Sequence, residues 1–418
     1  MKYVIIGNSA AGVNAAEAIR KNDAKGTVTI ISDEEFSAYG RPLISYYLEG
    51  KVKAENMFYR DDNFYKSRNI NAVLNTKAEK IDVKNKTVSA NTGKKYAYDK
   101  LLIATGSVPF IPQTQGLSNQ ENVFTFLTYK ESRRLKETIN KKSKVVIVGA
   151  GLIGLKAAEG LFGQVESITV LDLADRVMAS VLDKSAGALI QNHIERNDID
   201  FKLGVSVKEV IGQSKVSKIV LSDGSELLCD ILIMAVGVRP NVELAKGAGI
   251  KINRAIIVDE YLQTSQKDIY AAGDCVESWD CLSNVCKILA LWPNASNQGE
   301  TAGYNMSAGN KQKAPVAFAM NAISFFGLQL ISAGIIGQAD KDSIFDISSN
   351  KLRRLNIVDD KLIGYVLIND QQRAGIYTAL INDKTKLSSL EYDIKAKDIG
   401  LSVYPKESRT CKIWGKNQ

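Results

Sequence analysis

Two stretches of the sequence, residues 1–35 and 143–177, follow the same plan. Each begins with a short run of apolar, β-branched residues, passes through a turn rich in glycine and alanine, and continues into a helix-like segment. A second β-branched run comes next, and acidic residues follow it. This order predicts a strand, a tight turn, a helix and a second strand, which together form a βαβ unit.

The first copy predicts strands over Tyr3–Ile6 and Val28–Ile31, with a helix that runs through about Arg20. It departs from a fully glycine-rich turn at Ser9, whose small side chain adds a hydroxyl donor. The residues of this copy that we predict to bind a ligand are Gly7, Ser9, Ala10, Ala11, Gly12, Asp33 and Glu34.

The second copy predicts strands over Lys144–Val148 and Ile168–Leu171, with a helix that runs through about Phe162. Its turn has glycine at all three of the expected positions. The residues of this copy that we predict to bind a ligand are Gly149, Gly151, Leu152, Ile153, Gly154 and Asp172.

This spacing is typical of dinucleotide-binding domains. The first glycine permits the tight turn, the second lets backbone approach a pyrophosphate, and the third lets the helix pack closely on the strand. The start of the helix offers free N–H groups and the positive end of its dipole to the phosphates. An acid at the end of the second strand can bind the ribose hydroxyls. A carboxylate at Asp172 would repel a 2′-phosphate, so we expect NADH to be preferred over NADPH.

Composition excludes several other classes of protein. The net charge of +8 comes from lysines and arginines spread along 418 residues, without a nucleic-acid-binding motif. These charges are either a solvated surface or a basic face that steers an acidic protein partner. The longest apolar stretch, Ser324–Gly337, is interrupted by polar residues and reads as buried core, so we expect no membrane span. A strand that begins soon after Met1 leaves no room for a signal peptide, and we expect a cytoplasmic protein.

Cysteine and histidine are too sparse to predict a metal site. The cysteines are Cys229, Cys275, Cys281, Cys286 and Cys411. An odd number of cysteines in a long chain argues for a reducing compartment and against a disulfide framework. We expect structural or incidental roles for the close pair Cys281 and Cys286, and we assign no chemistry to the single histidine, His193.

Three further motifs follow in order: Tyr98–Ser107, Ile233–Asn241 and Ile269–Cys275. With the two turns, they make residues 1–335 resemble the FAD/NAD oxidoreductases that have two dinucleotide domains, the glutathione reductase-like and ferredoxin reductase-like flavoproteins. The resemblance implies an NAD domain inserted in the FAD domain. It adds FAD contacts at Ala104, Thr105, Gly106, Gly273, Asp274 and Ala295, and an NAD contact at Gly237.

The resemblance also implies an α/β fold class with two Rossmann-like dinucleotide-binding domains and a small C-terminal α+β domain. We predict an FAD domain over residues 1–112 and 245–312, an NAD domain over 113–244 and a C-terminal domain over 313–418. Within them, Asp274 would bind the ribityl chain of FAD. Residues Trp292–Gly299 lead into a helix that runs through about Met306, and the start of this helix would lie beside the pyrimidine edge of the flavin.

The segment Tyr39–Leu48 indicates the branch of the family. It resembles reductases of rubredoxin or ferredoxin and the flavoprotein part of nitrite reductases, and Arg41 and Pro42 would contact FAD. Disulfide reductases carry their electron-relay cysteine in this region, whereas this chain has no cysteine before Cys229. Many relatives carry a glutamate where Lys156 stands, and our hypothesis is that Lys156 tunes the flavin electrostatically beside the nicotinamide.

We therefore expect an FAD-dependent oxidoreductase that passes electrons between NAD(H) and an iron–sulfur electron-carrier protein or partner subunit. No metal ion and no nucleic acid are expected, and a homodimer is compatible with the sequence. Two alternatives stay open. One is an NADH oxidase or CoA-disulfide reductase, and the other is a flavoprotein whose response to NADH serves binding rather than turnover.

Overall fold

The computed structural model describes residues 1–118, 120–337, 343–348, 350–394 and 400–409. The chain forms two compact units. The first comprises residues 1–111, 127–134 and 237–317, and the second comprises residues 112–126, 135–236 and 318–418. Helix α4 (Tyr129–Thr138) begins in the first unit and ends in the second. The division into three domains made from the sequence stays a prediction.

The first unit is built on a five-stranded parallel sheet with the strand order β18-β7-β1-β2-β3. Its strands are β1 (Lys2–Ile6), β2 (Thr27–Ile31), β3 (Ile70–Val73), β7 (Lys100–Ile103) and β18 (Ile269–Ala271). Strand β1 is central and buried from its second residue on. It pairs with β2 on one side and with β7 on the other. Its continuous apolar run is typical of a parallel strand, which is covered on both faces of the sheet. Strand β18 joins the sheet from far along the chain, beside β7.

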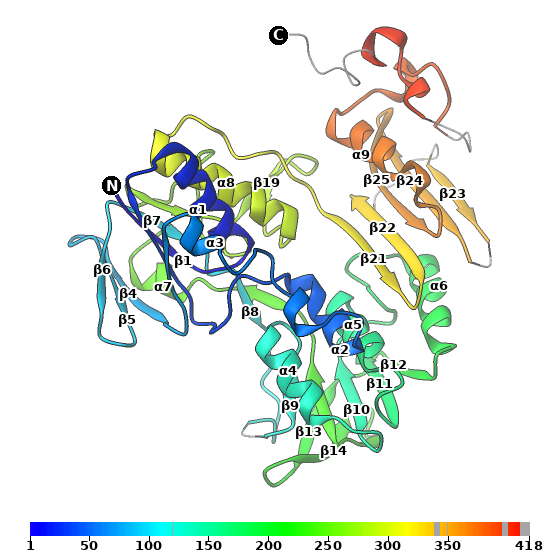
Figure 1. Cartoon of the computed structure of the whole chain (residues 1–418). Helices are drawn as coiled ribbons and strands as arrows, with labels where there is room; N and C mark the ends of the chain where they lie inside the picture. Colours follow the sequence, from blue (N-terminus) through cyan, green and yellow to red (C-terminus); the bar gives the residue numbers. More distant parts are fainter. Residues whose placement is uncertain (119, 338–342, 349, 395–399, 410–418) are drawn as a thin grey trace. The chain divides into compact units, whose positions relative to one another are not determined.

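Helices α1 (Ala10–Asn22) and α8 (Trp292–Ala308) lie side by side in this unit (Figure 1). Small residues permit the close approach. A Cβ on Gly299 would lie 2.1 Å from the carbonyl oxygen of Ala11, and one on Gly303 would lie 2.3 Å from that of Ala15. The helix that follows the first turn is therefore fixed by a helix almost 300 residues later in the chain.

The rest of the first unit consists of short elements around this sheet. They are α2 (Ile44–Glu49), α3 (Phe64–Ser67), α7 (Glu243–Gly247), the antiparallel sheet β4 (Ala78–Asp82), β5 (Thr87–Ala90) and β6 (Lys95–Ala97), and the pairs β8 (Ser107–Pro109) with β17 (Val238–Pro240) and β19 (Ser278–Asp280) with β20 (Val285–Lys287).

The second unit contains another five-stranded parallel sheet, with the order β12-β11-β10-β16-β9. Its strands are β9 (Val123–Thr125), β10 (Lys144–Val148), β11 (Ser167–Asp172), β12 (Ile199–Leu203) and β16 (Ile231–Met234). They are accompanied by α5 (Leu152–Leu161), α6 (Lys184–Glu195) and an antiparallel sheet of β13 (Val207–Gly212), β14 (Val216–Leu221) and β15 (Glu226–Leu228).

The C-terminal part of the second unit is an antiparallel sheet with the order β21-β22-β25-β24-β23 and one helix against it. The elements are β21 (Met320–Phe325), β22 (Leu328–Gly334), β23 (Ile344–Ile347), β24 (Leu352–Val358), β25 (Lys361–Ile368) and α9 (Ala374–Asn382). The rings of Tyr365 and Tyr377 lie 5.7 Å apart where α9 meets β25.

The predicted fold class is confirmed: two α/β layers of Rossmann type and a small α+β segment. The apolar stretch 324–337 lies in the β21–β22 hairpin and the turn after it. In the described part of the chain, none of the helices combines the length and hydrophobicity needed to span a membrane.

We expect Gly303→Ala to lower the free energy of unfolding by about 1–3 kcal/mol, because the added Cβ forces α8 away from Ala15. The matched control is Gly375→Ala in α9, where a Cβ meets no atom within 4 Å. Alanine there is a better helix former and gains up to about 1 kcal/mol. Chemical denaturation measures both. Equal stabilisation by the two substitutions would show that α1 and α8 do not pack as closely as described.

Candidate functional site

The two glycine-rich turns have the same backbone geometry. Gly7 has φ +115° and Gly149 has φ +116°. The N–H of Gly7 donates to the carbonyl of Ile31 at 2.8 Å, and that of Gly149 donates to the carbonyl of Leu171 at 2.7 Å. In each copy, the helix begins three residues after this glycine. The repeat in the sequence is therefore a repeat in structure.

The three glycines of the second turn differ in the space that a side chain would meet. A Cβ on Gly149 would lie 2.3 Å from the carbonyl oxygen of Ala235, and a Cβ on Gly154 would lie 1.8 Å from that of Gly149. Backbone fills both places. By contrast, a Cβ on Gly151 would meet no atom within 4 Å. The middle glycine thus faces open space at the start of α5, where a ligand's phosphate can approach the backbone.

The first turn repeats these contacts with one difference. A Cβ on Gly7 would lie 2.1 Å from the carbonyl oxygen of Ala104, and one on Gly12 would lie 2.0 Å from that of Gly7. Ser9 occupies the middle position as the N-cap residue of α1, and its side chain caps none of the helix N–H groups. The Ser9 hydroxyl is therefore available to a ligand.

The acidic residues of the two copies differ. The Asp172 carboxylate accepts the N–H of Ala150 at 2.7 Å and that of Ala174 at 2.8 Å, so it is held beside its turn. In the strand register, the position of Asp172 corresponds to the buried Ser32 of the first copy. The predicted acid Asp33 is exposed one residue further on. Counting residues from the ends of the paired strands would have shown that Ser32 is the positional equivalent of Asp172.

Glu34, the other predicted acid, already has partners. Its carboxylate forms an ion pair with Arg41 and accepts the hydroxyl of Tyr39 at 2.6 Å. Arg41 also donates to the carbonyl of Leu127 at 3.2 Å, and the N–H of Tyr129 donates to the Tyr39 hydroxyl at 3.0 Å. Burial raises the pKa of Tyr39, so its phenol stays neutral. This cluster fixes the chain around Arg41.

Pro42 belongs to the short 3-10 helix Arg41–Leu43, directly after that arginine. Thr105 and Gly106 lie between β7 and β8. The Thr105 hydroxyl donates to the carbonyl of Asn241 at 2.7 Å, and the N–H of Asn241 donates to the carbonyl of Gly106 at 2.9 Å. Gly237 belongs to the first unit, whereas the other predicted NAD residues belong to the second.

Asp274 provides a partly buried carboxylate in the first unit. It follows β18 and Gly273, and the Ser107 hydroxyl donates to it at 3.2 Å. Burial raises the pKa of Asp274, while Ser107 and Arg41 act in the opposite direction. An ionised carboxylate has room for about four donors, so this one can accept further hydroxyl groups. A polyhydroxyl chain fits this requirement.

The surroundings of Gly273 bring the predicted residues of the first unit together. A Cβ on Gly273 would lie 3.3 Å from the Cβ of Ala11 and 3.6 Å from that of Ala295. The side-chain oxygen of Gln298 accepts the N–H of Gly273 at 2.8 Å. The starts of α1 and α8 therefore meet at the strand end that carries Asp274. Gln298 and Ser107 lie within the segments Trp292–Gly299 and Tyr98–Ser107 but were not predicted as site residues, because their partners are distant in the sequence.

Lys156 is a partly buried, paired cation. Its ammonium group forms an ion pair with Glu159 one turn along α5 and lies 3.4 Å from the carbonyl oxygen of Ser324. Glu159 also accepts the N–H of Phe326 at 2.7 Å. Together the two residues join α5 to the β21–β22 hairpin. The proposed effect of Lys156 on a flavin stays a prediction, and Glu159 is a partner that the sequence did not identify.

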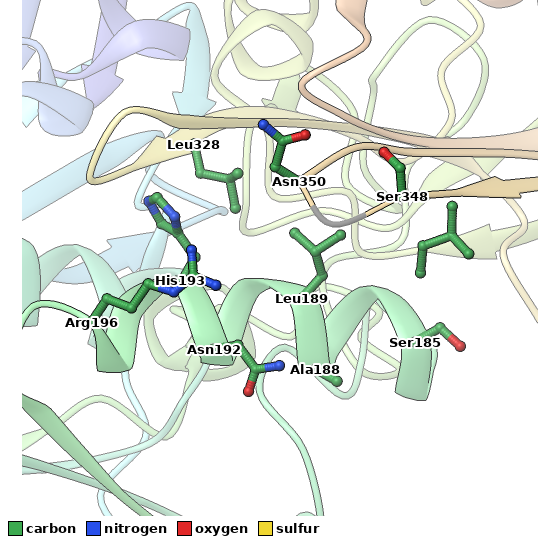
Figure 2. A pocket seen from close by; sticks show the side chains of 10 residues that line it. Ser185, Ala188, Leu189, Asn192, His193, Arg196, Leu328, Ser348 and Asn350 are labelled. Carbon is green, nitrogen blue, oxygen red and sulfur yellow. The ribbon is translucent and has the colours of Figure 1, made fainter.

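A cavity of about 340 Å³ lies between α6 and the C-terminal sheet of the second unit (Figure 2). Its lining comprises Ser185, Ala188, Leu189, Asn192, His193, Arg196, Leu328, Ile347, Ser348 and Asn350. The His193 side chain lies along α6, and its Nε2 atom is 3.1 Å from the carbonyl oxygen of Phe326. None of the predicted site residues lines this cavity.

The cysteines do not gather into a redox centre in the described part of the chain. Cys229, Cys275 and Cys281 are buried, and Cys286 is exposed. Burial raises the pKa of Cys229 to about 12 and also raises that of Cys275, so both thiols stay protonated. Cys411 lies outside the described residues. Among those residues, no group of three or more histidine, cysteine or acidic side chains is arranged to hold a metal ion.

Two turns of the same geometry, each in a parallel sheet, define a protein with two dinucleotide-binding layers. Residues 1–299 match the family model described as pyridine nucleotide-disulphide oxidoreductase. The chain belongs to this family, which confirms the family predicted from the sequence.

The chain is similar to three proteins of this kind. It is 30% identical to a rubredoxin-NAD(+) reductase of Pseudomonas putida over 90% of this chain and 97% of that protein. It is 29% identical to the nitrite reductase [NAD(P)H] of Bacillus subtilis over 93% of this chain and spans only about half, 48%, of that protein. A solved NAD-dependent persulfide reductase from A. fulgidus has a TM-score of 0.86 at 27% identity, covering 99% of this chain and 83% of that one.

We expect Asp274→Asn to raise the free energy of unfolding of the cofactor-free chain at neutral pH. Because burial raises the pKa of Asp274, the folded chain bears the cost of a partly buried carboxylate at every pH above that raised pKa. As the pH falls through the raised pKa, the Asp274 carboxyl becomes neutral, and the wild-type chain and the variant converge in stability. Urea unfolding over a series of pH values measures the difference. A difference that widens towards acid pH would contradict the assignment.

Proposed function

We propose that this chain is an FAD-dependent NADH oxidoreductase. It passes electrons between NAD(H) and an iron–sulfur electron carrier of the rubredoxin or ferredoxin type, or a partner subunit of that kind. The observation that carries the proposal is the duplicated turn, with Gly7 and Gly149 in the same conformation and an open helix start after each. One turn serves a flavin nucleotide and the other a nicotinamide nucleotide.

The residues of the first unit fit FAD. The start of α1 and the free Ser9 hydroxyl would bind the pyrophosphate, and Asp274 would accept hydroxyls of the ribityl chain. Arg41 would lie near the phosphates or ribose, held in place by Glu34. The further FAD residues that we propose are Gly7, Ala10, Ala11, Gly12, Asp33, Pro42, Ala104, Thr105, Gly106, Gly273 and Ala295. When bound, FAD would take a hydride from NADH and give up its electrons one at a time.

The residues of the second unit fit NADH. Backbone at Gly151, Leu152 and Ile153 would bind the pyrophosphate at the start of α5. Asp172, held by two N–H groups, would accept the ribose hydroxyls and repel a 2′-phosphate. Gly149 and Gly154 shape the turn, and Gly237 stays a proposed NAD contact.

Helix α8 supports the flavin in a second way. It is a long helix, 17 residues, with Ala295 near its start and no acidic residue in its first turn. The positive end of its dipole is therefore not neutralised by the helix's own side chains. A flavin edge placed there would be stabilised when it carries negative charge. Lys156, paired with Glu159, stays a proposed electrostatic influence on the flavin from the second unit.

The cysteines favour an external one-electron acceptor over a thiol relay. No cysteine precedes Cys229, and the buried Cys229 and Cys275 thiols have raised pKa values. A relay cysteine needs an accessible thiolate. Similarity to a rubredoxin-NAD(+) reductase supports the same choice of acceptor. We further propose that the chain works in the cytoplasm, where its cysteines stay reduced, either alone or as a homodimer.

Stopped-flow spectroscopy separates this function from its alternatives. The FAD-loaded chain is reduced anaerobically with one equivalent of NADH and then mixed separately with oxygen, CoA disulfide, rubredoxin and ferredoxin. We expect an iron–sulfur protein to restore the flavin absorbance fastest. Fastest reoxidation by oxygen or CoA disulfide would overturn the proposal in favour of an oxidase or disulfide reductase. No rapid reoxidation by any of the four would favour a binding role.

We expect Asp172→Asn to raise the ratio of kcat/KM for NADPH to that for NADH by roughly tenfold, because it removes a negative charge opposite the 2′-phosphate. Asparagine keeps a side-chain oxygen for one of the two N–H donors. The matched control is Asp175→Asn, an acid of the same loop that pairs with Arg176 and Lys184. If both variants change the ratio equally, the Asp172 carboxylate does not discriminate between NADH and NADPH at the ribose.

We expect iodoacetamide to leave the NADH-dependent reduction of ferricyanide unchanged. The exposed Cys286 will be alkylated, whereas burial protects Cys229, Cys275 and Cys281. Activity and alkylation are followed together, with peptide mapping by mass spectrometry to locate the label. Loss of ferricyanide reduction in step with alkylation of any cysteine would restore the thiol-relay mechanism.

A further inference from the structure

The β19–β20 hairpin of the first unit exposes large apolar side chains. Trp279 is 55% exposed and Val285 is 48% exposed, and Cys286 is exposed as well. Val316, in a neighbouring segment, is 61% exposed. Isolated exposed apolar residues are ordinary, but a contiguous group that includes tryptophan marks a contact surface.

The strand register places three of these residues in one row. Trp279 lies opposite Cys286 in the antiparallel pair, so the two side chains share a face. Asp280 forms a parallel bridge with Ala317, and the N–H of Cys281 donates to the carbonyl of Ala317 at 3.3 Å. This register sets Val316 beside Trp279 on that same face. We call Val316, Trp279 and Cys286 the exposed row.

Beside the exposed row, the cation lies outward and the nearby carboxylates are buried. Arg254 is exposed, and its guanidinium lies 3.5 Å from the carbonyl oxygen of Cys286. Lys287 lies opposite Ser278, on the other face of the hairpin, where it pairs with the buried Asp280. Glu277, which accepts the N–H of Arg254, is also buried. An approaching protein therefore meets positive charge first, and the net charge of +8 acts in the same direction.

The Gln298 side chain links the hairpin to the proposed flavin site. Gln298 of α8 donates to the Ser278 hydroxyl at 2.5 Å and accepts the N–H of Gly273 at 2.8 Å. Ser278 precedes Trp279, and Gly273 precedes Asp274. Through Gln298, the residue before Trp279 is therefore hydrogen-bonded to the residue before Asp274, which is proposed to bind the ribityl chain. All of these residues belong to the same unit.

We propose that the exposed row, with Arg254 beside it, is the docking surface for an acidic iron–sulfur carrier protein. This inference rests on the proposed function and names the partner's surface. Tryptophan and arginine dominate binding energy in protein interfaces, and opposite charge speeds the encounter. Each NADH supplies two electrons and releases one proton overall as NAD⁺ forms. Two oxidised carriers dock in turn, and each leaves with one electron.

The test uses the FAD-loaded full chain with acidic rubredoxin and ferredoxin as probes. We expect Trp279→Ser and Arg254→Glu each to raise KM for the carrier about tenfold or more, with the NADH–ferricyanide rate unchanged. Arg254→Glu should also flatten the dependence of KM on salt. The matched control is Leu228→Ser, which removes a side chain that is 63% exposed on the edge strand β15 of the second unit. This control should change neither the KM for the carrier nor the NADH–ferricyanide rate.

Binding is measured without turnover as well. Bound carrier should slow the reaction of Cys286 with a maleimide, read by peptide mapping, and this protection should be lost in Trp279→Ser. Ferricyanide reduction tests the proposed function separately, so its failure is distinguishable from failure of docking. The inference is overturned if neither carrier protects Cys286 in the wild-type chain, or if the variants keep the wild-type KM. It is also overturned if Trp279→Ser converts a dimer into a monomer, because the row then serves a second copy.

Discussion

The close approach of a glycine to the end of a neighbouring strand is the constraint on which both layers depend. At Gly7 and at Gly149, the backbone turns sharply within reach of a carbonyl from the adjacent strand, where a side chain has no room. The conformation directs the following helix so that its free N–H groups point at the strand ends. Because the chain uses this arrangement twice, it can bind two nucleotides by one physical principle. The close approach of α1 and α8, permitted by small residues, then fixes the first helix.

Much of the fold could be predicted because periodicity and glycine spacing are local signals. The strands, turns and helices of both copies occur where the repeat places them. Contacts between distant segments were less accessible. The register shows that Ser32, not Asp33, is the positional equivalent of Asp172, and the pairing of Glu34 with Arg41 joins segments that no local pattern connects. Gln298 and Glu159 each bond to a backbone N–H far away in the chain and to one side chain, and such contacts leave no pattern in the sequence.

Electrostatics divides the work among the charged side chains. Asp274 keeps a partly buried carboxylate with spare acceptor capacity, which suits a ligand rich in hydroxyl groups. Glu34, Arg41, Lys156 and Glu159 are instead satisfied within the protein and hold segments together. The buried, protonated thiols of Cys229 and Cys275 take no part in redox chemistry on this account. In the proposed function the electrons leave by way of a second protein, and Arg254 beside the exposed row indicates the charge of that protein.

Anaerobic titration of the reconstituted chain with NADH tests the central claim most directly. The chain is incubated with FAD, freed of excess by gel filtration, and its bound flavin is counted before NADH is added. The account predicts one FAD for each chain and full loss of the oxidised flavin spectrum with one equivalent of NADH. A chain that remains colourless after reconstitution, or a bound flavin that NADH leaves oxidised, would contradict it.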